Sequence, residues 1–283
     1  MIRADLILVL GGSVKTGSRV ARLLTRRGLR VRIGHRSGGT PFDRTDPATW
    51  APALEGARAA YIAYDTDLAA PGAPETICAF AELAVASGAR RLGPLSGRGE
   101  QEAEAREKAV ARSGADWTVL RASWLAQNFS EGHLLKPVLA GEVALPAFEV
   151  GEPFVDAADI AEVPAALLTQ HGHAGRGYEL TGSRLLTFAD AVATIAEATG
   201  RDILFVSVPA DDHAAGLAAE GVPDEVTGLL TYLFTTVLGW RGAHLGDGVQ
   251  QVLGRPAQDF TTYAHDTATT DIWTDKTTDR GAA

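Results

Sequence analysis

Up to about residue 125, short aliphatic runs alternate with longer segments of helical periodicity. This alternation is typical of βαβ units, and it predicts a parallel sheet with right-handed crossovers. The aliphatic runs predict strands at Leu6–Leu10, Arg30–Gly34, Ala59–Tyr64, Arg91–Leu95 and Trp117–Leu120. The intervening segments predict helices at Thr16–Arg27, Pro47–Leu54, Pro74–Ser87 and Glu100–Ser113, with left-handed caps at Gly28, Gly88 and Gly114. We therefore expect an α/β fold, a doubly wound parallel sheet of the Rossmann type.

After Trp124 the pattern changes to helices and short extended pieces. Phe188–Thr199 is amphipathic and ends at Gly200, and Asp224–Leu238 predicts a second, more apolar helix. The extended pieces are Gly141–Pro146, Phe154–Val155, Tyr178–Leu180 and Ile203–Val208. Ligands of open α/β sheets bind beyond the carboxyl ends of the strands, so this half should supply a smaller, mainly helical substrate subdomain.

These patterns predict three parts of the chain. Residues 1–128 should form the Rossmann nucleotide-binding core. Residues 129–268 should form the substrate-covering part, with the strands around 155 and 178 rejoining the core. Residues 269–283 are rich in Thr, Asp and Gly, and we expect a tail that is mobile or docks on a partner through Trp273.

Composition narrows the kinds of partner. The 283 residues are 46% hydrophobic and carry a net charge of −9, so the chain lacks the basic surface that direct nucleic-acid binding requires. No apolar run approaches the roughly 20 residues that span a bilayer, so we expect no membrane partner. The single cysteine, Cys78, and the absence of a leader favour the cytoplasm. Oligomeric state stays open, a homodimer included.

A glycine-rich turn follows the first predicted strand and precedes a helix. Its residues are Gly11, Gly12, Ser13, Val14, Lys15, Thr16 and Gly17. A tight turn against a helix N-terminus binds anions, so this position predicts a dinucleotide phosphate site. Val14 stands where the middle glycine of the fingerprint lets the backbone approach the pyrophosphate. The turn can shift and keep the nucleotide, bind it more weakly or lose it, and we favour retention.

The end of the second strand indicates which dinucleotide binds. Gly34-His35-Arg36-Ser37 offers no carboxylate for the adenosine ribose hydroxyls. An arginine there suits a 2′-phosphate, and Lys15 can share that phosphate, so Arg36 and Ser37 favour NADP(H) over NAD. The alternative is that Arg36 is a solvated loop charge.

Several segments resemble, in order and spacing, the NmrA-like family of atypical short-chain dehydrogenase/reductase proteins. Besides the glycine turn and Arg36 they are Pro41–Asp43, Asp46–Trp50, Ser113–Arg121, Gln127–Phe129, Phe154–Asp156, Asp159–Ala161 and Tyr178–Gly182. The resemblance covers most of the chain. It implies a Rossmann domain with a small carboxyl-terminal substrate domain and NADP(H) in the crevice. The family includes NADPH-dependent quinone reductases and redox-sensing regulators, so the resemblance alone gives no reaction.

The usual catalytic pair of the wider superfamily is absent. Its reductases use Tyr-x-x-x-Lys, in which the tyrosine donates a proton to a carbonyl. None of the five tyrosines has a lysine four residues later, and the expected positions hold Gly99 and Ala103. Hydride transfer to a quinone requires little acid catalysis beyond positioning, so a quinone-like acceptor is compatible with this absence.

Few polar or aromatic side chains remain near the expected nicotinamide. Ser96, Tyr64 and Asn128 are the catalytic candidates, and Trp124 and Tyr64 are candidates for stacking on an aromatic substrate. Each has a structural alternative, since Ser96 can be a turn residue and the two aromatic side chains can belong to the core.

Three other polar groups have simpler interpretations. His171 and His173 lie in a glycine-rich connection without a carboxylate or cysteine cluster, so we expect no metal site there. Asp156 and Asp159 fall at a strand-to-helix junction, where we expect both to cap the helix. Glu100, Glu102, Glu104 and Glu107 predict a solvated helical face.

Three hypotheses of function follow. The first is an NADPH-dependent oxidoreductase acting on a quinone or another flat, conjugated or aromatic carbonyl compound, as in aromatic natural-product metabolism; a variant uses the fold for coupling, dehydration or isomerisation. The second is an NADP-binding regulator that senses redox state without turnover. The third is a protein that has lost the nucleotide through Val14.

Overall fold

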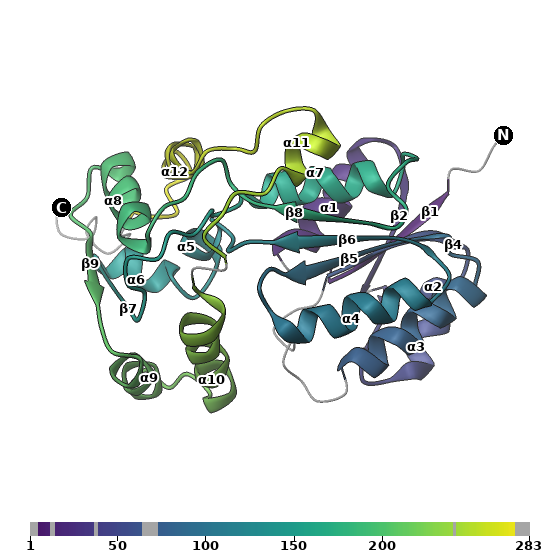
Figure 1. The fold of residues 1–283 in the computed structure, drawn as a ribbon, viewed down its shortest axis with the longest axis horizontal. Coiled ribbons are helices and arrows are strands. Elements are labelled where there is room, and N and C mark those ends of the chain that lie inside the picture. Colours follow the sequence, from purple (N-terminus) through teal and green to yellow (C-terminus); the bar gives the residue numbers. More distant parts are fainter. Residues whose placement is uncertain (1–4, 12–14, 37–38, 64–72, 240–241, 275–283) are drawn as a thin grey trace, which may run out of the picture. The chain divides into compact units, whose positions relative to one another are not determined.

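The computed structural model describes residues 5–11, 15–36, 39–63, 73–239 and 242–274. The first part of the chain forms β1 (Leu6–Leu10), α1 (Lys15–Arg26), β2 (Arg30–His35), β3 (Thr40–Pro41), the 3-10 helix η1 (Pro47–Thr49), α2 (Trp50–Leu54), β4 (Ala57–Ile62), α3 (Ala73–Ala86), β5 (Arg91–Gly97), α4 (Gln101–Arg112) and β6 (Asp116–Ala122) (Figure 1). The rest forms α5 (Asn128–Glu131), α6 (Leu135–Ala140), β7 (Glu142–Leu145), α7 (Ala157–Leu167), β8 (Arg176–Leu180), α8 (Phe188–Thr199), β9 (Leu204–Ser207), α9 (Ala210–Ala219), α10 (Asp224–Tyr232), the π-helical turn η2 (Leu233–Val237), α11 (Gly248–Leu253) and α12 (Phe260–Ala268).

The chain divides into two compact units. Unit 1 comprises residues 1–123, 157–181 and 246–256, and unit 2 comprises residues 124–156, 182–245 and 257–283. The first boundary falls at Ser123, five residues before the predicted one at 128. Two later segments return to unit 1 because β8 joins its sheet and α11 packs on α7.

Unit 1 contains a seven-stranded parallel sheet in the order β3-β2-β1-β4-β5-β6-β8. The five strands predicted in the first half are all present, with ends that differ by no more than two residues. Helices α1 and α7 pack together on one face and α3 and α4 on the other, as Figure 1 shows. Both faces are therefore covered, which explains why β1 is buried at every position. The predicted Rossmann-type α/β fold is confirmed.

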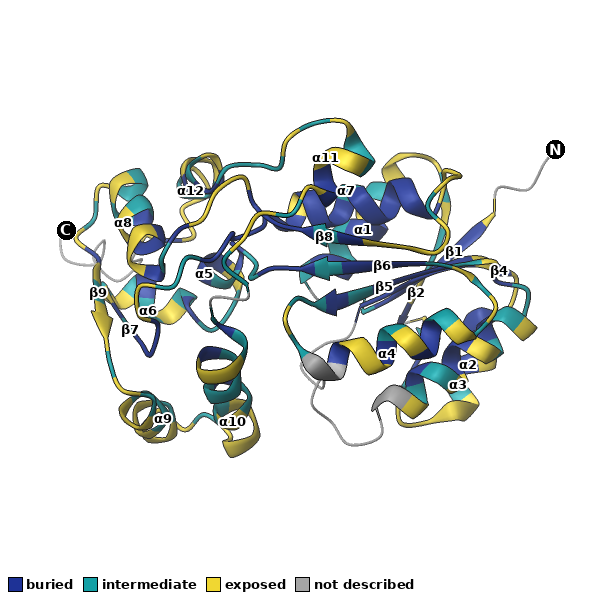
Figure 2. Cartoon of the chain, viewed as in Figure 1, coloured by how far each residue is buried: buried dark blue, intermediate teal, exposed yellow. Residues whose placement is uncertain are grey.

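Unit 2 is built around an aromatic core that includes Phe129, Phe154, Phe188 and Phe260. Helix α8 begins and ends where the sequence predicts: Thr187 and Asp190 form a capping box at its start, and Gly200 takes a left-handed conformation at its end. Figure 2 shows the burial of α8 on one side only. A small parallel sheet, β7 with β9, completes the unit.

The last described residues belong to the core of unit 2. The Trp273 side chain is 1% exposed, and its indole N–H donates to the Phe129 carbonyl at 2.8 Å. The ring also lies edge-on to Tyr263, with 6.0 Å between the ring centroids. The sequence predicted a tail from residue 269 that is mobile or docks on a partner through Trp273, but this side chain packs in its own chain, and residues 275–283 lie outside the described residues. Among the described residues no helix combines the length and the apolar composition needed to cross a membrane.

Candidate functional site

The predicted strand–turn–helix is present at the start of the chain. Gly11 directly follows β1 with a φ of +70°, a left-handed conformation that glycine adopts without strain. Helix α1 begins at Lys15, so its free N–H groups lie at the carboxyl end of β1. Gly12, Ser13 and Val14 lie outside the described residues.

The far side of this turn is anchored in the sheet. Thr16 and Gly17 are buried, and Thr16 lies beside Tyr61 of β4, whose side chain is fully enclosed. Burial raises the pKa of the Tyr61 phenol, and a hydrogen bond with Thr16 opposes this only in part. Tyr61 is therefore a neutral packing residue, and Thr16 faces the interior.

Arg36 directly follows β2 and is exposed. Arg36 is close enough to Asp43 to act on its pKa. Hydrogen bonds from the Thr45 hydroxyl and the Thr45 N–H lower the pKa of Asp43 most, and the positive charges of Arg36 and Arg44 lower it further. At Gly34, in the same strand, a Cβ would lie 2.7 Å from Leu10 Cδ2, so the end of β2 packs closely on β1. Ser37 and Tyr64 lie outside the described residues.

Ser96 lies near the end of β5 and is 9% exposed. The cavity beside it measures about 20 Å³ and is lined also by Arg106 and Glu107 of α4. That volume accommodates a single water, not a substrate ring. The two positions of the absent catalytic pair lie nearby, Gly99 before α4 and the buried Ala103 within it.

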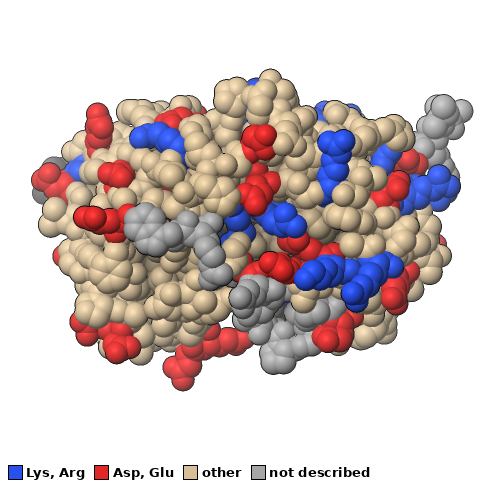
Figure 3. Space-filling model, in the orientation of Figure 1, with Lys and Arg blue, Asp and Glu red and all other residues tan. Residues whose placement is uncertain are grey.

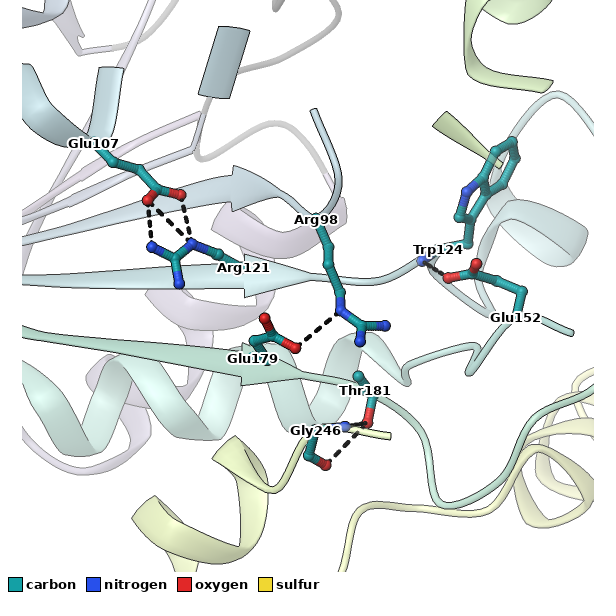
Figure 4. A network of polar contacts seen from close by, with 8 residues as sticks. All are labelled: Arg98, Glu107, Arg121, Trp124, Glu152, Glu179, Thr181 and Gly246. Atoms are coloured by element: carbon teal, nitrogen blue, oxygen red, sulfur yellow. Dashed lines mark hydrogen bonds and ion pairs between the residues drawn. The ribbon is translucent and has the colours of Figure 1, made fainter. Parts of the chain in front are cut away.

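A group of ion pairs lies at the carboxyl ends of β5, β6 and β8. Arg121 binds Glu107 with two nitrogens, at 2.9 Å from Nε to Oε1 and 2.6 Å from Nη2 to Oε2. Arg98 Nε lies 3.1 Å from Glu179 Oε2, and both contacts are drawn in Figure 4. The hydrogen bonds of Glu107 raise the pKa of Arg121 although burial opposes this.

The interpretation of the α4 glutamates as a solvated face is wrong for two of them. The side chains of Glu100 and Glu107 are only 10% and 11% exposed, whereas that of Glu104 is 69% exposed. Glu100 pairs with Arg106 at 3.6 Å. The signal was in the sequence: Glu100 and Glu107 are seven residues apart, on the helix face that also carries the apolar Ala103 and Val110.

The segment that returns from unit 2 is attached to the end of β8. The Thr181 hydroxyl donates to the Gly246 carbonyl and accepts from the Gly246 N–H, both at 3.1 Å (Figure 4). A Cβ at Gly246 would lie 2.7 Å from the Cβ of Glu179. This close packing requires glycine.

The two predicted junction carboxylates have partners other than a helix cap. Asp156 accepts from Gln127 Nε2 at 3.1 Å, in unit 2. Asp159, in unit 1, is fully buried, with its Oδ1 2.7 Å from Arg255 Nη2. The capping of α7 by these two carboxylates stays a prediction, and Asp159 has in addition a partner almost one hundred residues away in the sequence.

The loop histidines make local contacts in unit 1. His171 Nδ1 lies 3.0 Å from Arg91 Nη2, and His173 Nδ1 lies 2.9 Å from the Tyr178 hydroxyl oxygen. Burial lowers the pKa of His173, and the charges of Arg176 and Arg91 lower it further.

Trp124 and Asn128 are both in unit 2. The backbone N–H of Trp124 donates to Glu152 Oε1 at 3.2 Å. The half-buried indole ring of Trp124 lies edge-on to Phe188, with 5.2 Å between the ring centroids. Asn128 is the first residue of α5 and is half-buried. Trp124 also contacts Phe234, which sequence reasoning did not single out.

Charge on the visible surface agrees with the sequence. On the face shown in Figure 3, Lys and Arg side chains lie among Asp and Glu side chains, not in one continuous basic area. That face therefore lacks the extended positive surface that phosphate backbones bind.

No protein-family model matches the chain. Among curated proteins it is similar to the uncharacterized oxidoreductase YesF of Bacillus subtilis, 28% identical over 97% of this chain and 100% of the relative. It is also similar to the NAD(P)H azoreductase of Xenophilus azovorans, 26% identical over 92% of this chain and 96% of the relative. Both similarities run through the two units.

Solved structures share the fold. An NADPH complex of the NADPH-dependent quinone oxidoreductase of Escherichia coli superposes with a TM-score of 0.75 at 19% identity, over 92% of this chain and 99% of the other. The negative transcriptional regulator NmrA, in complex with NADP, superposes with a TM-score of 0.69 at 15% identity, over 95% and 97%.

Proposed function

We propose that the chain is a member of the NmrA-like family of atypical short-chain dehydrogenase/reductase proteins and an NADP(H)-dependent oxidoreductase. Its substrate is a quinone or another flat, conjugated or aromatic carbonyl compound. The observation that carries the proposal is the turn at Gly11 before α1, together with Arg36 at the end of the adjacent strand β2. A location in the cytoplasm is part of the proposal, because the only cysteine, Cys78, is free.

The described residues fit the proposed cofactor. The N-terminus of α1 supplies backbone N–H groups for a pyrophosphate, and Gly11 provides the left-handed turn between strand and helix. Arg36 is exposed beside β2 and can bind a 2′-phosphate, and we propose Lys15, the first residue of α1, as a second ligand of the same group. Bound NADPH supplies a hydride for reduction.

The residues around the substrate position it more than they activate it. Reduction of a quinone to a hydroquinone takes up one hydride and one proton, and a quinone accepts hydride without a strong acid. This suits a chain that has Gly99 and Ala103 in place of tyrosine and lysine. We propose Ser96, Asn128 and Tyr64 as polar groups near the reacting carbonyl, and Trp124 and Tyr64 as stacking partners. An aromatic natural-product intermediate fits the same requirements.

A steady-state assay tests this proposal. Purified protein is incubated with NADPH and a panel of quinones and aromatic ketones, and both NADPH absorbance and product are followed. We expect quinone-dependent NADPH oxidation that Trp124→Ala weakens mainly through KM. Absence of oxidation and of product with every acceptor would reject the reductase.

A second candidate is an NADP-binding regulator without turnover, and the absent catalytic pair favours it. Tight binding that differs between NADP⁺ and NADPH, with no turnover, is its signature. A coupling, dehydration or isomerisation enzyme would instead convert substrate with no net change in NADPH.

A further inference from the structure

Unit 2 contains a rare backbone feature. Helix α10 does not end in a regular turn: it continues into the π-helical turn η2, in which the Leu238 N–H donates to the Leu233 carbonyl at 2.8 Å. This extra residue per turn costs regular hydrogen bonding and is found mostly at functional sites. In this chain the turn contains the buried Phe234.

Phe234 is the centre of an aromatic group that we call the Phe234 cluster, with Trp124, His133 and His213 around it. The Phe234 side chain is buried, and its centroid lies 4.9 Å from that of Trp124, 5.6 Å from that of His213 and 6.4 Å from that of His133. The three surrounding residues are only half-buried. Partly exposed rings around one buried ring offer flat apolar area for stacking.

His213, on α9, adds a polar group to this apolar surface. Its Nδ1 is closed off from solvent and has no hydrogen-bond partner among the described residues. The residue as a whole is half-buried. Burial lowers the pKa of His213, so the ring is neutral near neutral pH. A neutral imidazole carries one proton, and the tautomer with the proton on Nε2 can donate a hydrogen bond from that nitrogen.

Chain connectivity puts one member of the cluster where a substrate is expected. Strand β6 ends at Ala122, and Trp124 follows two residues later. In open α/β sheets ligands bind beyond the carboxyl ends of the strands. The Phe234 cluster therefore includes a residue that comes directly from such an end.

We infer that the Phe234 cluster binds the flat ring of the substrate and that His213 Nε2–H donates a hydrogen bond to its carbonyl oxygen. This inference rests on the proposed function and narrows it, since it selects conjugated carbonyl compounds over flat hydrocarbons. His213 contacts the substrate directly, and it orients the carbonyl group.

Equilibrium dialysis with two probes of similar area tests the inference. Naphthoquinone carries carbonyl acceptors and naphthalene carries none. In the presence of NADP⁺, which prevents turnover, we expect wild type to bind naphthoquinone about five- to tenfold more tightly than naphthalene, the effect of one buried hydrogen bond. His213→Phe should erase this preference, while His213→Gln, whose amide lies near the position of Nε2, should retain most of it.

The control is His265→Phe, because His265 is exposed on α12 of the same unit. It should bind both probes as wild type does. With NADPH and naphthoquinone, His213→Phe should raise KM about five- to tenfold. Thermal melts of each variant show whether the fold is intact, and His213→Gln covers the case in which His213→Phe does not fold.

The outcomes separate the two proposals. If no quinone is reduced, the proposed function fails, while the dialysis preference still decides the role of His213. If wild type reduces quinones and His213→Phe keeps both the preference and KM, the role of His213 is overturned and the proposed function stands. Wild type that binds both probes equally, or neither, also overturns it.

Discussion

Arg255 and Asp159 form an ion pair that joins the returning segment of unit 1 to α7. Asp159 is 0% exposed, Arg255 is 39% exposed, and their closest nitrogen and oxygen are 2.7 Å apart. Glu162 lies 3.1 Å from the same Arg255 nitrogen. The guanidinium therefore compensates a carboxylate that water does not reach.

Arg255→Ala should destabilise the protein by about 2–3 kcal/mol, because it leaves the Asp159 charge buried without its cation. Denaturant unfolding measures the loss. Lys108→Ala is the matched control, since Lys108 and Glu104 are 68% and 69% exposed, and it should cost about 0.5 kcal/mol or less.

Adding Asp159→Asn to Arg255→Ala should recover part of that loss, because the second substitution removes the uncompensated charge. Losses that simply add up would contradict this explanation of the pair.

Gly248 should not tolerate a side chain. A Cβ there would lie 2.5 Å from the Glu179 carbonyl oxygen, and the backbone of β8 cannot move aside cheaply. Gly248→Ala should therefore cost about 1–3 kcal/mol of unfolding free energy.

Gly216→Ala in α9 is the opposite case, because nothing lies within 4 Å of its Cβ position. There alanine favours the helix and should stabilise the protein by about 0.5–1 kcal/mol. Equal effects of the two substitutions would argue against the close packing of α11 on β8.

Asp259 should make unit 2 sensitive to acid. Burial alone would raise the pKa of Asp259, but hydrogen bonds from Arg184, the Thr261 N–H and Ser183 lower it to about 2. A pKa below the unfolded value stabilises the fold above about pH 4, and this stability is lost as the pH falls toward about 2.

Asp259→Asn tests this, because asparagine keeps the N-cap of α12 and loses only the charge. The Asp259 side chain is 36% exposed, so solvent screens its charge. The variant should therefore have a free energy of unfolding about 0.5–1 kcal/mol below that of wild type at neutral pH. This difference in unfolding free energy, measured by denaturant unfolding, should shrink as the pH approaches 3. A difference that persisted in acid would assign the effect to packing.

Local patterns predicted the elements well. Phe188–Thr199 was placed to the residue because its amphipathic face, the Thr187 cap and Gly200 all lie within that stretch. The strand Leu6–Leu10 was likewise placed to the residue, because its apolar run has clear ends.

Partners distant in sequence were not predictable from these patterns. Asp159 pairs with Arg255, and the Trp273 indole N–H donates to the Phe129 carbonyl. Nothing around Asp159 or Trp273 distinguishes such contacts from a cap or a free tail. The π-helical turn that contains Phe234 was also missed, since Asp224–Leu238 has an ordinary helical pattern. The positions of Val14, Ser37 and Tyr64 in the site stay predictions.

Titration of NADPH and NADH into wild type, Arg36→Ala and Val14→Gly tests the central claim most directly. Wild type should prefer NADPH, and Arg36→Ala should weaken NADPH binding about ten- to a hundredfold, the effect of a lost charge-assisted phosphate contact, with NADH unchanged. Val14→Gly should bind NADPH equally or more tightly, and Arg22→Ala, at an exposed position of α1, should match wild type. Wild type that binds neither nucleotide, or Arg36→Ala that keeps the NADPH preference, would contradict the account.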